Sequence, residues 1–454
     1  MTMDLFDQLG EFARGRMAHY HVPGVAVGLL QNGQARTAGF GVTNSEHPLP
    51  VDGRTLFQIG SITKTITGTA LMRLVIGGQL DLDAPVRAYL PGLHLADEDV
   101  AARVTTRHLL THTGGWLGDF FDDSGRGDDA LERMLDRVAR LPQIAPLGAV
   151  WSYNNAGFYV AGRLLEMLTG RAYERAARAL VLDPLGMSHS FFFAEDAISH
   201  RVAAGHAAIY EPAESEAGAA PAVARPWGLA RAANPVGGLA SCAADMLRYA
   251  ALQLGDEPAL LPPAALAQMH APRVPAANGE RLGLTWFVRD AAGLRVLRHG
   301  GATHGQCASF WVAPGRRFAL VVLTNSERGD ELHQAVTRWV LERYLGVIEP
   351  EPPTLPVPAA QQVEYTGRYT AAAADRVLYR EAGELWLQIE PKGGFPTPAS
   401  PPGERPPAVR LALCGPDCLV MLDEPLQGAR AEILRDAGGR IEWLRAGGRI
   451  HRRA

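Results

Sequence analysis

The chain has 454 residues, of which 47% are hydrophobic and 20% charged, and its formal net charge is −4. This length exceeds one ordinary core and predicts two or three globular domains. The small net charge excludes a strongly basic surface, so neither nucleic acid nor a membrane is expected as a partner.

The N-terminal sequence and the number of cysteines indicate the cellular compartment of the protein. The first residues lack the basic start and apolar run of a secretory signal, and no stretch reaches the roughly 18 apolar residues of a membrane span. Four cysteines, Cys242, Cys307, Cys414 and Cys418, are too few for a disulfide framework. We therefore expect a cytoplasmic protein with reduced thiols. The alternative is a mature exported protein without its leader.

The first half of the chain predicts mainly helices. Apolar residues at helical spacing predict a helix over 4–19, and Asn32-Gly33 between two apolar runs predicts a hairpin over 25–41. Further helices are expected over 63–76, 107–112, 128–141, 156–169 and 173–182. Residues 205–235 are polar, rich in Ala and Pro and aperiodic, which predicts a long irregular loop.

The second half predicts mainly strands. After a helix over 241–254, strands are expected over 284–288, 294–297, 308–312 and 318–323, with a closing helix over 331–345. Five prolines within 349–358 indicate a semi-rigid linker. Short alternating runs follow at 377–380, 385–389, 409–413, 419–422, 431–434 and 441–444. They predict a small antiparallel barrel or sandwich.

Ser61 and Lys64 form the motif with the clearest chemistry. Lysine occurs only at Lys64 and Lys392, so 44 − 2 = 42 of the basic residues are arginines. Arginine keeps its proton in a protein, whereas a desolvated lysine can lose it. Residues three apart share a helix face, so Lys64 can take the proton that a serine nucleophile must lose. A solvated surface lysine is the alternative, because an isolated S-x-x-K is common.

A proton-relay partner is expected within Trp151–Asn155, where two registers compete. Ser152-Tyr153-Asn154 would supply a second serine, and Tyr153-Asn154-Asn155 would supply a phenol. Y-x-N occurs nowhere else in the chain. A phenol beside a cationic lysine can act as acid or base. A buried tyrosine at a helix start is the alternative.

Arg298-His299-Gly300-Gly301-Ala302 follows a predicted strand and is the candidate for the third part of the site. Glycines beside a strand let a substrate approach the backbone closely. A rival H-x-G occurs at His112-Thr113-Gly114, but its helical surroundings favour a structural role. Taken alone, His-Gly-Gly would indicate a turn.

Ser-x-x-Lys, Tyr-x-Asn and His-x-Gly, in this order, resemble the serine β-lactamase and penicillin-recognising superfamily. The likeness is greatest to the class C-like branch, with its D-aminopeptidases, D,D-carboxypeptidase-like enzymes and carboxylesterases, and it covers roughly residues 10–346. Glu364–Tyr369 resembles the start of the lipocalin-like C-terminal domain of some relatives. The resemblance implies an α+β fold: an antiparallel sheet flanked by helices with an all-helical subdomain, plus a small C-terminal antiparallel β-barrel.

The expected domains follow from the linker and the resemblance together. Residues 1–346 would form the hydrolase domain, with its helical subdomain at roughly 80–235. Residues 347–360 would form the Pro-rich linker, and residues 361–454 the lipocalin-like barrel.

The resemblance also implies catalytic roles. Ser61 would be the acylated nucleophile, and Lys64 its base, neutral at least transiently. Tyr153 would share the proton relay and protonate the leaving group. The backbone N–H groups of Ser61 and Ala302 would form the oxyanion hole.

Three further residues would contact the substrate or position the relay. Asn155 would hold Lys64 and the acyl side chain. His299, with Gly301 beside it, would line the site or help orient Tyr153. His299 stands where many relatives have the lysine of Lys-Thr-Gly, a fixed positive charge that β-lactam carboxylates use. Its replacement favours esters or peptides over β-lactams.

The expected function is a serine hydrolase that needs no metal or cofactor and cleaves small amides or peptides, with D-configured residues among the candidates. The alternatives are a carboxylesterase on short acyl esters, a β-lactamase and a slowly turning-over penicillin-binding protein. A small-molecule or peptide substrate is expected, and the C-terminal domain suggests a homo-oligomer. Cys414-x-x-x-Cys418 has no second pair and predicts a turn rather than a metal site.

Overall fold

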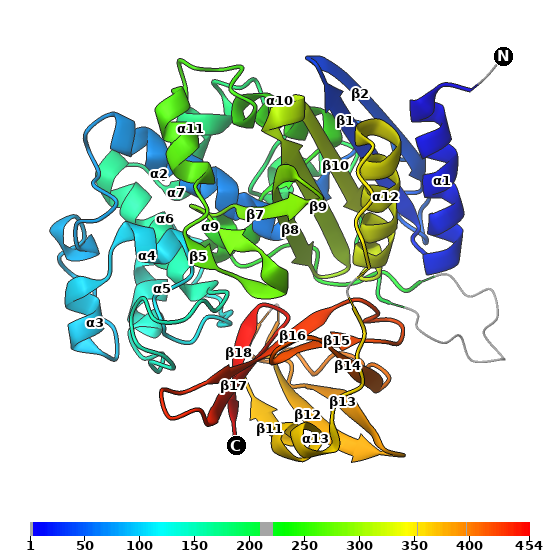
Figure 1. Ribbon diagram of the computed structural model, residues 1–454. Coiled ribbons are helices and arrows are strands. Elements are labelled where there is room, and N and C mark those ends of the chain that lie inside the picture. The colour runs from blue at the N-terminus through cyan, green and yellow to red at the C-terminus, as the bar shows by residue number, and fades with distance from the viewer. Residues whose placement is uncertain (1–2, 209–220, 352, 396) are drawn as a thin grey trace.

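The computed structural model describes residues 3–208, 221–351, 353–395 and 397–454. Within these ranges the chain forms an antiparallel sheet covered by helices and, beside it, a closed β-barrel (Figure 1). The α+β architecture expected from the sequence is confirmed.

The helices lie mainly in the first three quarters of the chain. They are α1 (Leu5–Tyr20), α2 (Thr63–Ile76), α3 (Glu98–Arg103), α4 (Thr106–Leu110), α5 (Ala130–Val138), α6 (Ala156–Thr169), α7 (Tyr173–Ala177), α8 (Ala194–Ala197), α9 (Asn234–Gly237), α10 (Ala243–Gln253), α11 (Pro263–His270), α12 (Gly329–Leu345) and α13 (Ala359–Tyr365).

The strands form the sheet, a small pair and the barrel. They are β1 (Gly24–Gln31), β2 (Gln34–Gly41), β3 (Phe57–Gln58), β4 (Ala240–Ser241), β5 (Val274–Pro275), β6 (Arg281–Leu282), β7 (Phe287–Ala291), β8 (Leu294–Thr303), β9 (Gln306–Ala313), β10 (Phe318–Thr324), β11 (Gly367–Thr370), β12 (Ala374–Glu381), β13 (Glu384–Pro391), β14 (Val409–Gly415), β15 (Cys418–Met421), β16 (Arg430–Arg435), β17 (Ile441–Ala446) and β18 (Arg449–Arg453).

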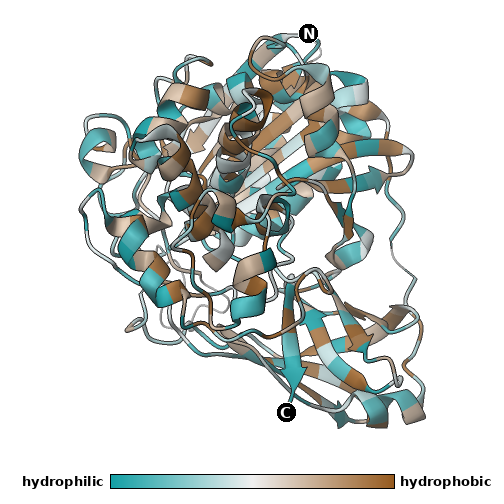
Figure 2. Ribbon diagram, turned by 90° about the vertical axis from the view of Figure 1, so that its left-hand side faces the viewer, coloured by the Kyte–Doolittle hydropathy of each residue, from teal (hydrophilic) through white to brown (hydrophobic). Residues whose placement is uncertain are grey.

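The central sheet has the strand order β2-β1-β10-β9-β8-β7-β6-β5, and every neighbouring pair is antiparallel. Successive side chains of β1 point to opposite faces. Val25 and Val27 therefore enter the core beneath α1 and α12, whereas Ala26 and Leu30 enter the core beneath α2 and α10. Figure 2 shows hydrophobic residues concentrated in the sheet and on the helices packed against it.

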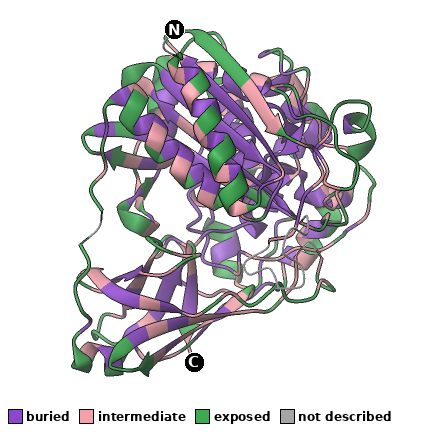
Figure 3. Cartoon of the chain, turned by 90° about the vertical axis from the view of Figure 1, so that its right-hand side faces the viewer, coloured by how far each residue is buried: buried purple, intermediate pink, exposed green. Residues whose placement is uncertain are grey.

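Helix α1 illustrates how the sequence determines its element. Asp4 caps the helix by accepting hydrogen bonds from the backbone N–H groups of Phe6 (2.8 Å) and Asp7 (3.0 Å). The buried residues recur at helical spacing, among them Phe6, Leu9 and Ala13. Figure 3 shows exposed residues on the outward side of the helices over the sheet and buried residues in the strands behind them.

The C-terminal barrel closes with eight strands in sequential order, β11 to β18. Its core contains Leu378, Leu387, Leu419 and Leu444 with other apolar side chains. Six of the strands coincide with predicted runs, but β11 and β18 were not predicted. The sequence of β18, Arg-Ile-His-Arg-Arg, has too few apolar residues for a period-two pattern.

Four other expectations differ from the structure. The strand expected over 284–288 is β7, which runs over Phe287–Ala291. Strand β8 continues through His299-Gly300-Gly301, because β9 pairs with it as far as Thr303, so these residues form no turn. The helix expected over 173–182 divides into α7 and a π-helical turn over Arg178–Leu182. The loop expected over 205–235 ends in helical turns, and its residues 209–220 lie outside the described ranges.

The connection between the two parts contains no helix or strand over its described residues. Helix α12 ends at Leu345 and α13 begins at Ala359. Leu355 forms a two-way backbone pair with Leu413 of β14, so this segment is fixed to the barrel. Proline 352 of the predicted linker lies outside the described ranges. No helix among the described residues is long and apolar enough to cross a membrane.

Candidate active site

Ser61 lies where a sharp backbone turn leads into α2. Gly60 has φ +51°, a left-handed conformation that glycine adopts without strain, and it begins the 3-10 turn Gly60–Ile62. Lys64 follows one turn later within α2. The 3-10 turn and the helix therefore present both side chains on one face, as the spacing predicts.

Lys64 is fully buried, with an exposed fraction of 0%. Its Nζ lies 3.0 Å from Ser61 Oγ and donates a 2.8 Å hydrogen bond to the Val236 carbonyl oxygen. Burial lowers the pKa of Lys64 well below its usual value, Arg449 adds to this effect and Asp119 opposes it. A neutral amine held in this way can direct its lone pair at the serine hydroxyl.

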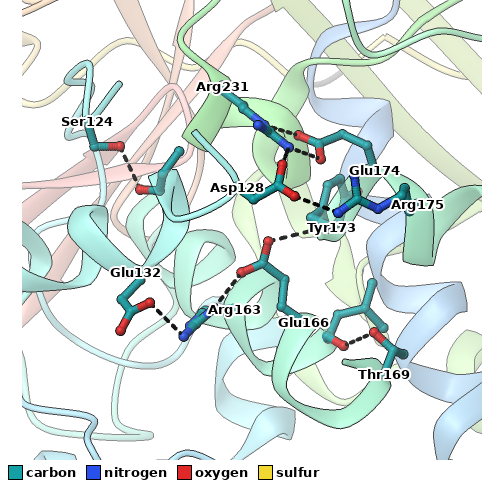
Figure 4. Close-up of polar contacts among 12 residues, drawn as sticks. Ser124, Asp128, Glu132, Arg163, Glu166, Thr169, Tyr173, Glu174, Arg175 and Arg231 are labelled. Atoms are coloured by element: carbon teal, nitrogen blue, oxygen red, sulfur yellow. Dashed lines mark hydrogen bonds and ion pairs between the residues drawn. The ribbon is translucent and has the colours of Figure 1, made fainter. Parts of the chain in front are cut away.

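The segment that supplies the Val236 carbonyl is held by a polar network (Figure 4). Arg231 donates hydrogen bonds to Glu174 at 3.1 Å and to Asp128 at 2.6 Å. Asn234 donates to the same Glu174 at 2.7 Å. Charged hydrogen bonds of this kind fix geometry well. These bonds fix the chain just before the Val236 carbonyl that accepts from Lys64.

Tyr153 covers the Ser61–Lys64 pair. Lys64 Nζ lies 4.9 Å from the centroid of its ring. Burial raises the pKa of Tyr153, and Ser61 beside it acts in the opposite direction. Even so, the hydroxyl makes no hydrogen bond of standard geometry with the described residues. Ser152, the competing candidate, instead accepts a 3.3 Å hydrogen bond from the backbone N–H of Ile450 in the barrel.

His112 packs against the ring of Tyr153. The two rings are stacked with centroids 4.4 Å apart. The backbone N–H of Asn154 donates to His112 Nδ1 at 2.9 Å, and burial lowers the pKa of His112 well below its usual value. The ring is therefore neutral. The sequence placed His112 outside the site, but the structure places it directly behind Tyr153.

The third motif lies on β8, next to the turn that carries Ser61. An ideal Cβ on Gly301 would lie 1.9 Å from the Ile59 carbonyl oxygen and 3.0 Å from the Ser61 nitrogen. An ideal Cβ on Gly60 would lie 2.6 Å from the Ala302 nitrogen. Glycine at both positions allows this approach. The backbone segments that carry the Ser61 and Ala302 nitrogens thus lie close together.

His299 lines the same region from β8. Its ring lies 6.3 Å from that of Tyr153, and its Nδ1 lies 2.6 Å from the Gly300 carbonyl oxygen. Burial and the nearby Lys64 lower the pKa of His299 to about 3, so the ring is neutral. The fixed positive charge of a lysine at this position has no counterpart here.

Asn155 does not contact Lys64 by a hydrogen bond in the described structure. Its amide donates to Asp119 Oδ1 at 2.8 Å. Asp119 also accepts from Arg449 at 3.0 and 3.2 Å. Burial alone would raise the pKa of Asp119, but Arg449, Asn155 and Lys64 together outweigh burial and lower the pKa. Asn155 therefore belongs to an ion-pair cluster that includes Asp119 and Arg449.

The C-terminal barrel contributes directly to this site through the turn between β17 and β18. The backbone N–H of Tyr153 donates a 2.8 Å hydrogen bond to the Gly448 carbonyl oxygen. An ideal Cβ on Gly448 would lie 3.1 Å from the Trp151 ring, so the turn fits closely. Arg449 follows, with its guanidinium 4.7 Å from the centroid of the Tyr153 ring. Arg449, Asp119 and Gly448 carry no local sequence signal that identifies them.

A cavity of about 780 Å³ opens between the hydrolase part and the barrel. One side exposes the residues predicted from the sequence, Ser61, Tyr153, Asn155, His299, Gly301 and Ala302. The other side is formed by the mouth of the barrel, including Arg376, Arg430, Arg449 and His451. No cluster of metal-binding side chains occurs among the described residues.

Comparison with known proteins shows the family to which the chain belongs. Residues 9–345 match the protein family described as Beta-lactamase. The chain belongs to this family. It is 35% identical over 353 residues to "Penicillin-binding protein 4" of Amycolatopsis lactamdurans, which covers 75% of this chain and 91% of that protein. It is 39% identical to "Esterase EstB" of Burkholderia gladioli over 162 residues, 32% of this chain and 41% of the esterase.

Solved structures support the fold of both parts. SurE superimposes with a TM-score of 0.75 at 24% identity and covers 99% of each chain. A class C β-lactamase from Rhodobacter sphaeroides superimposes with a TM-score of 0.61 at 22% identity and covers 75% of this chain. The beta-lactamase fold, the accompanying barrel and membership of a family of serine hydrolases are thereby confirmed.

Proposed function

We propose that the protein is a serine hydrolase that forms an acyl-enzyme on Ser61 and cleaves small amides or peptides. The observation that carries the proposal is the contact between Lys64 Nζ and Ser61 Oγ, 3.0 Å apart in a fully buried setting. Burial favours the neutral amine, which is the form that can accept the serine proton.

Acylation then proceeds through attack on the carbonyl carbon and departure of the leaving group. Ser61 Oγ attacks the substrate carbonyl carbon while its proton moves to Lys64 Nζ. The carbonyl oxygen becomes an oxyanion beside the backbone N–H groups of Ser61 and Ala302. As the bond to the leaving group breaks, that group takes a proton from Tyr153, which Lys64 resupplies.

Deacylation reverses these roles. A water molecule gives a proton to the relay and attacks the ester carbon, and the Ser61 oxygen leaves with a proton from Lys64. Tyr153 is suited to such transfer because its hydroxyl has no competing hydrogen bond in the described structure. Burial raises the pKa of Tyr153, so the phenol is protonated and holds the proton that the leaving group takes.

The cavity favours extended acyl donors over compact ones. Its volume of about 780 Å³ lies toward the upper end of the range for small-molecule sites. Its wall combines apolar groups with charged ones, as a peptide requires. One solved structure of the same architecture is titled "Crystal structure of SurE with D-Leu", so derivatives of D-leucine are the first substrates to test.

A carboxylesterase is the second candidate, and the stretch that resembles "Esterase EstB" favours it. Hydrolysis of β-lactams is less well supported, because the neutral His299 supplies no fixed charge for a β-lactam carboxylate. A homo-oligomer stays a prediction, which sedimentation of the purified protein would test.

A matched substrate panel tests the proposal. Wild type and Ser61→Ala are assayed with p-nitrophenyl esters, with D- and L-amino-acid p-nitroanilides and with a chromogenic cephalosporin. We expect wild type to turn over the amides, with D-derivatives preferred, and Ser61→Ala to be inactive on all. Equal activity of the two proteins would contradict the mechanism. Turnover of esters alone would support the esterase.

A further inference from the structure

The charged side chains on the barrel side of the cavity are all basic. The barrel residues that line it include three arginines, Arg376 (β12), Arg430 (β16) and Arg449 (β18), and no aspartate or glutamate. Arg449 is neutralised by its ion pair with Asp119. Neither Arg376 nor Arg430 forms an ion pair with any residue in the described part of the chain.

Arg376 is the more confined of these two. Its Nε is buried without a hydrogen-bond partner among the described residues. Its Nη1 has only a long contact of 3.5 Å to the Asp375 carbonyl oxygen. The Asp375 carboxylate itself binds Arg368 and Lys392 instead. A guanidinium with five donors is therefore left largely unsatisfied at the cavity wall.

The surroundings of Arg376 disfavour its charge. Burial lowers its pKa to about 10, Arg449 adds to the effect and Asp375 opposes it. The neighbouring His451 carries no negative charge that could offset the charge of Arg376. Burial and Arg376 lower the pKa of His451 to about 4, so its ring is neutral. A partly buried cation without an ion pair is unfavourable, and an incoming anion relieves it.

Three of the four carboxylates that line the opposite wall are paired with other arginines, and the fourth, Asp330, is exposed. The paired carboxylates are Asp119, Asp122 and Glu280, whose partners are Arg449, Arg137 and Arg298. Asp330 lies 3.5 Å from His333. The unpaired positive charge is thus confined to the barrel side, where apolar side chains such as Ile389 and Met421 also line the cavity.

We propose that Arg376, with Arg430 at the rim, forms a subsite for a carboxylate of the peptide that is acylated on Ser61. This inference rests on the proposed function and specifies its substrate class: peptides with an acidic side chain or a free terminal carboxylate. A planar guanidinium binds a carboxylate through two parallel hydrogen bonds. The apolar surroundings hold the adjoining side chains and exclude water from the pair.

Two pairs of peptides separate the sources of the carboxylate. The first is a pair of p-nitroanilides that differ only by Glu against Gln in the side chain. The second is a peptide with a free terminal acid and the same peptide as its amide. We expect wild type to favour the acidic member of one pair in kcat/KM by about tenfold or more, as for a charged hydrogen bond. The pair that shows the preference identifies the source.

Variants assign the preference to the subsite. Arg376→Gln should reduce the ratio of acidic to neutral kcat/KM to near one, and Arg430→Gln should reduce it in part. Arg440→Gln is the control, because Arg440 is an exposed arginine of the same barrel paired with Asp436. It should leave the ratio as in wild type. No preference in wild type, or a ratio unaltered by Arg376→Gln, would overturn the subsite.

A binding measurement separates this inference from the catalytic one. Calorimetry with Ser61→Ala reports affinity for the same peptides without turnover. If the acidic peptide binds more tightly and Arg376→Gln removes the difference, the subsite stands even where the proposed chemistry fails. If turnover proceeds through Ser61 while neither peptide pair shows a difference, the chemistry stands and the subsite is wrong.

Discussion

At the scale of single residues, Lys64 combines two properties that the sequence and the structure reveal separately. Its rarity and its spacing from Ser61 are visible in the sequence. Its complete burial and its bond to the Val236 carbonyl are visible only in the fold. The acceptor could not be predicted, because it is a backbone atom 172 residues away in the sequence.

Lys64→Met tests the base directly. Methionine has a similar volume and no amine, so we expect kcat/KM to fall by about a thousandfold or more while the protein stays folded. Lys392→Met in the barrel is the control for loss of a lysine. Stopped-flow acylation and circular dichroism check both effects. Retention of more than a tenth of the activity would exclude Lys64 as the base.

The pH dependence of wild type follows from the same residue. Only neutral Lys64 accepts the serine proton, and burial lowers its pKa well below 10.5. Acylation should therefore be fast and level at neutral and mildly alkaline pH, and it should fall as acid protonates the amine. The measurement is kcat/KM against pH. A rate that still rises tenfold per pH unit near pH 10 would show an unshifted lysine.

Tyr153→Phe and Ser152→Ala distinguish the two registers of the second motif. Phenylalanine keeps the stacking on His112 and removes a buried hydroxyl without a standard partner. We expect Tyr153→Phe to lose about a hundredfold in kcat with no loss of melting temperature. Ser152→Ala should have a small effect, because its hydroxyl faces Ile450. The reverse order would identify Ser152 as the relay.

At the scale of elements, helix boundaries were predicted correctly where the sequence marks the end of the helix. Helices α2 and α6 begin and end where expected, since Gly77 and Gly170 follow their last residues. Strand β8 was expected to end before His299, because glycines usually interrupt a strand. Its pairing with β9 carries it on to Thr303 and brings Gly301 against Ser61.

This close approach gives a prediction with a neighbouring control. Gly301→Ala would place a methyl group 1.9 Å from the Ile59 carbonyl oxygen and displace the Ser61 turn. We expect kcat to fall by about a hundredfold or more, as on loss of an oxyanion donor. At Gly300 the nearest atom to an added Cβ, the Ala308 oxygen, is 3.8 Å away, so Gly300→Ala should be tolerated. Equal effects would contradict this packing.

At the scale of the whole molecule, the barrel lines the cavity that contains Ser61. Its β17–β18 turn binds the backbone of Tyr153, and Arg449 binds Asp119. The sequence predicts a barrel but leaves open whether the barrel touches the site, because long-range docking leaves no local pattern. The basic strand β18 was itself missed for its lack of alternating apolar residues.

The ion pair between the two parts can be measured by a double-mutant cycle. Arg449→Met leaves a buried carboxylate without its cation and should lower the free energy of unfolding by about 1–3 kcal/mol. Asp119→Asn combined with Arg449→Met should recover part of this loss. Urea unfolding gives the values, with Arg440→Met as the exposed control. Simple additivity would show that the pair contributes no coupling between barrel and hydrolase part.

The most direct test of the account is the mass of the enzyme during turnover. The protein is mixed with an activated D-leucyl ester, quenched within milliseconds and examined by intact and peptide mass spectrometry. We predict an added acyl group on Ser61 in wild type and none in Ser61→Ala or Lys64→Met. Turnover with the acyl group on another residue, or with Lys64→Met acylated as fast as wild type, would contradict the central claim.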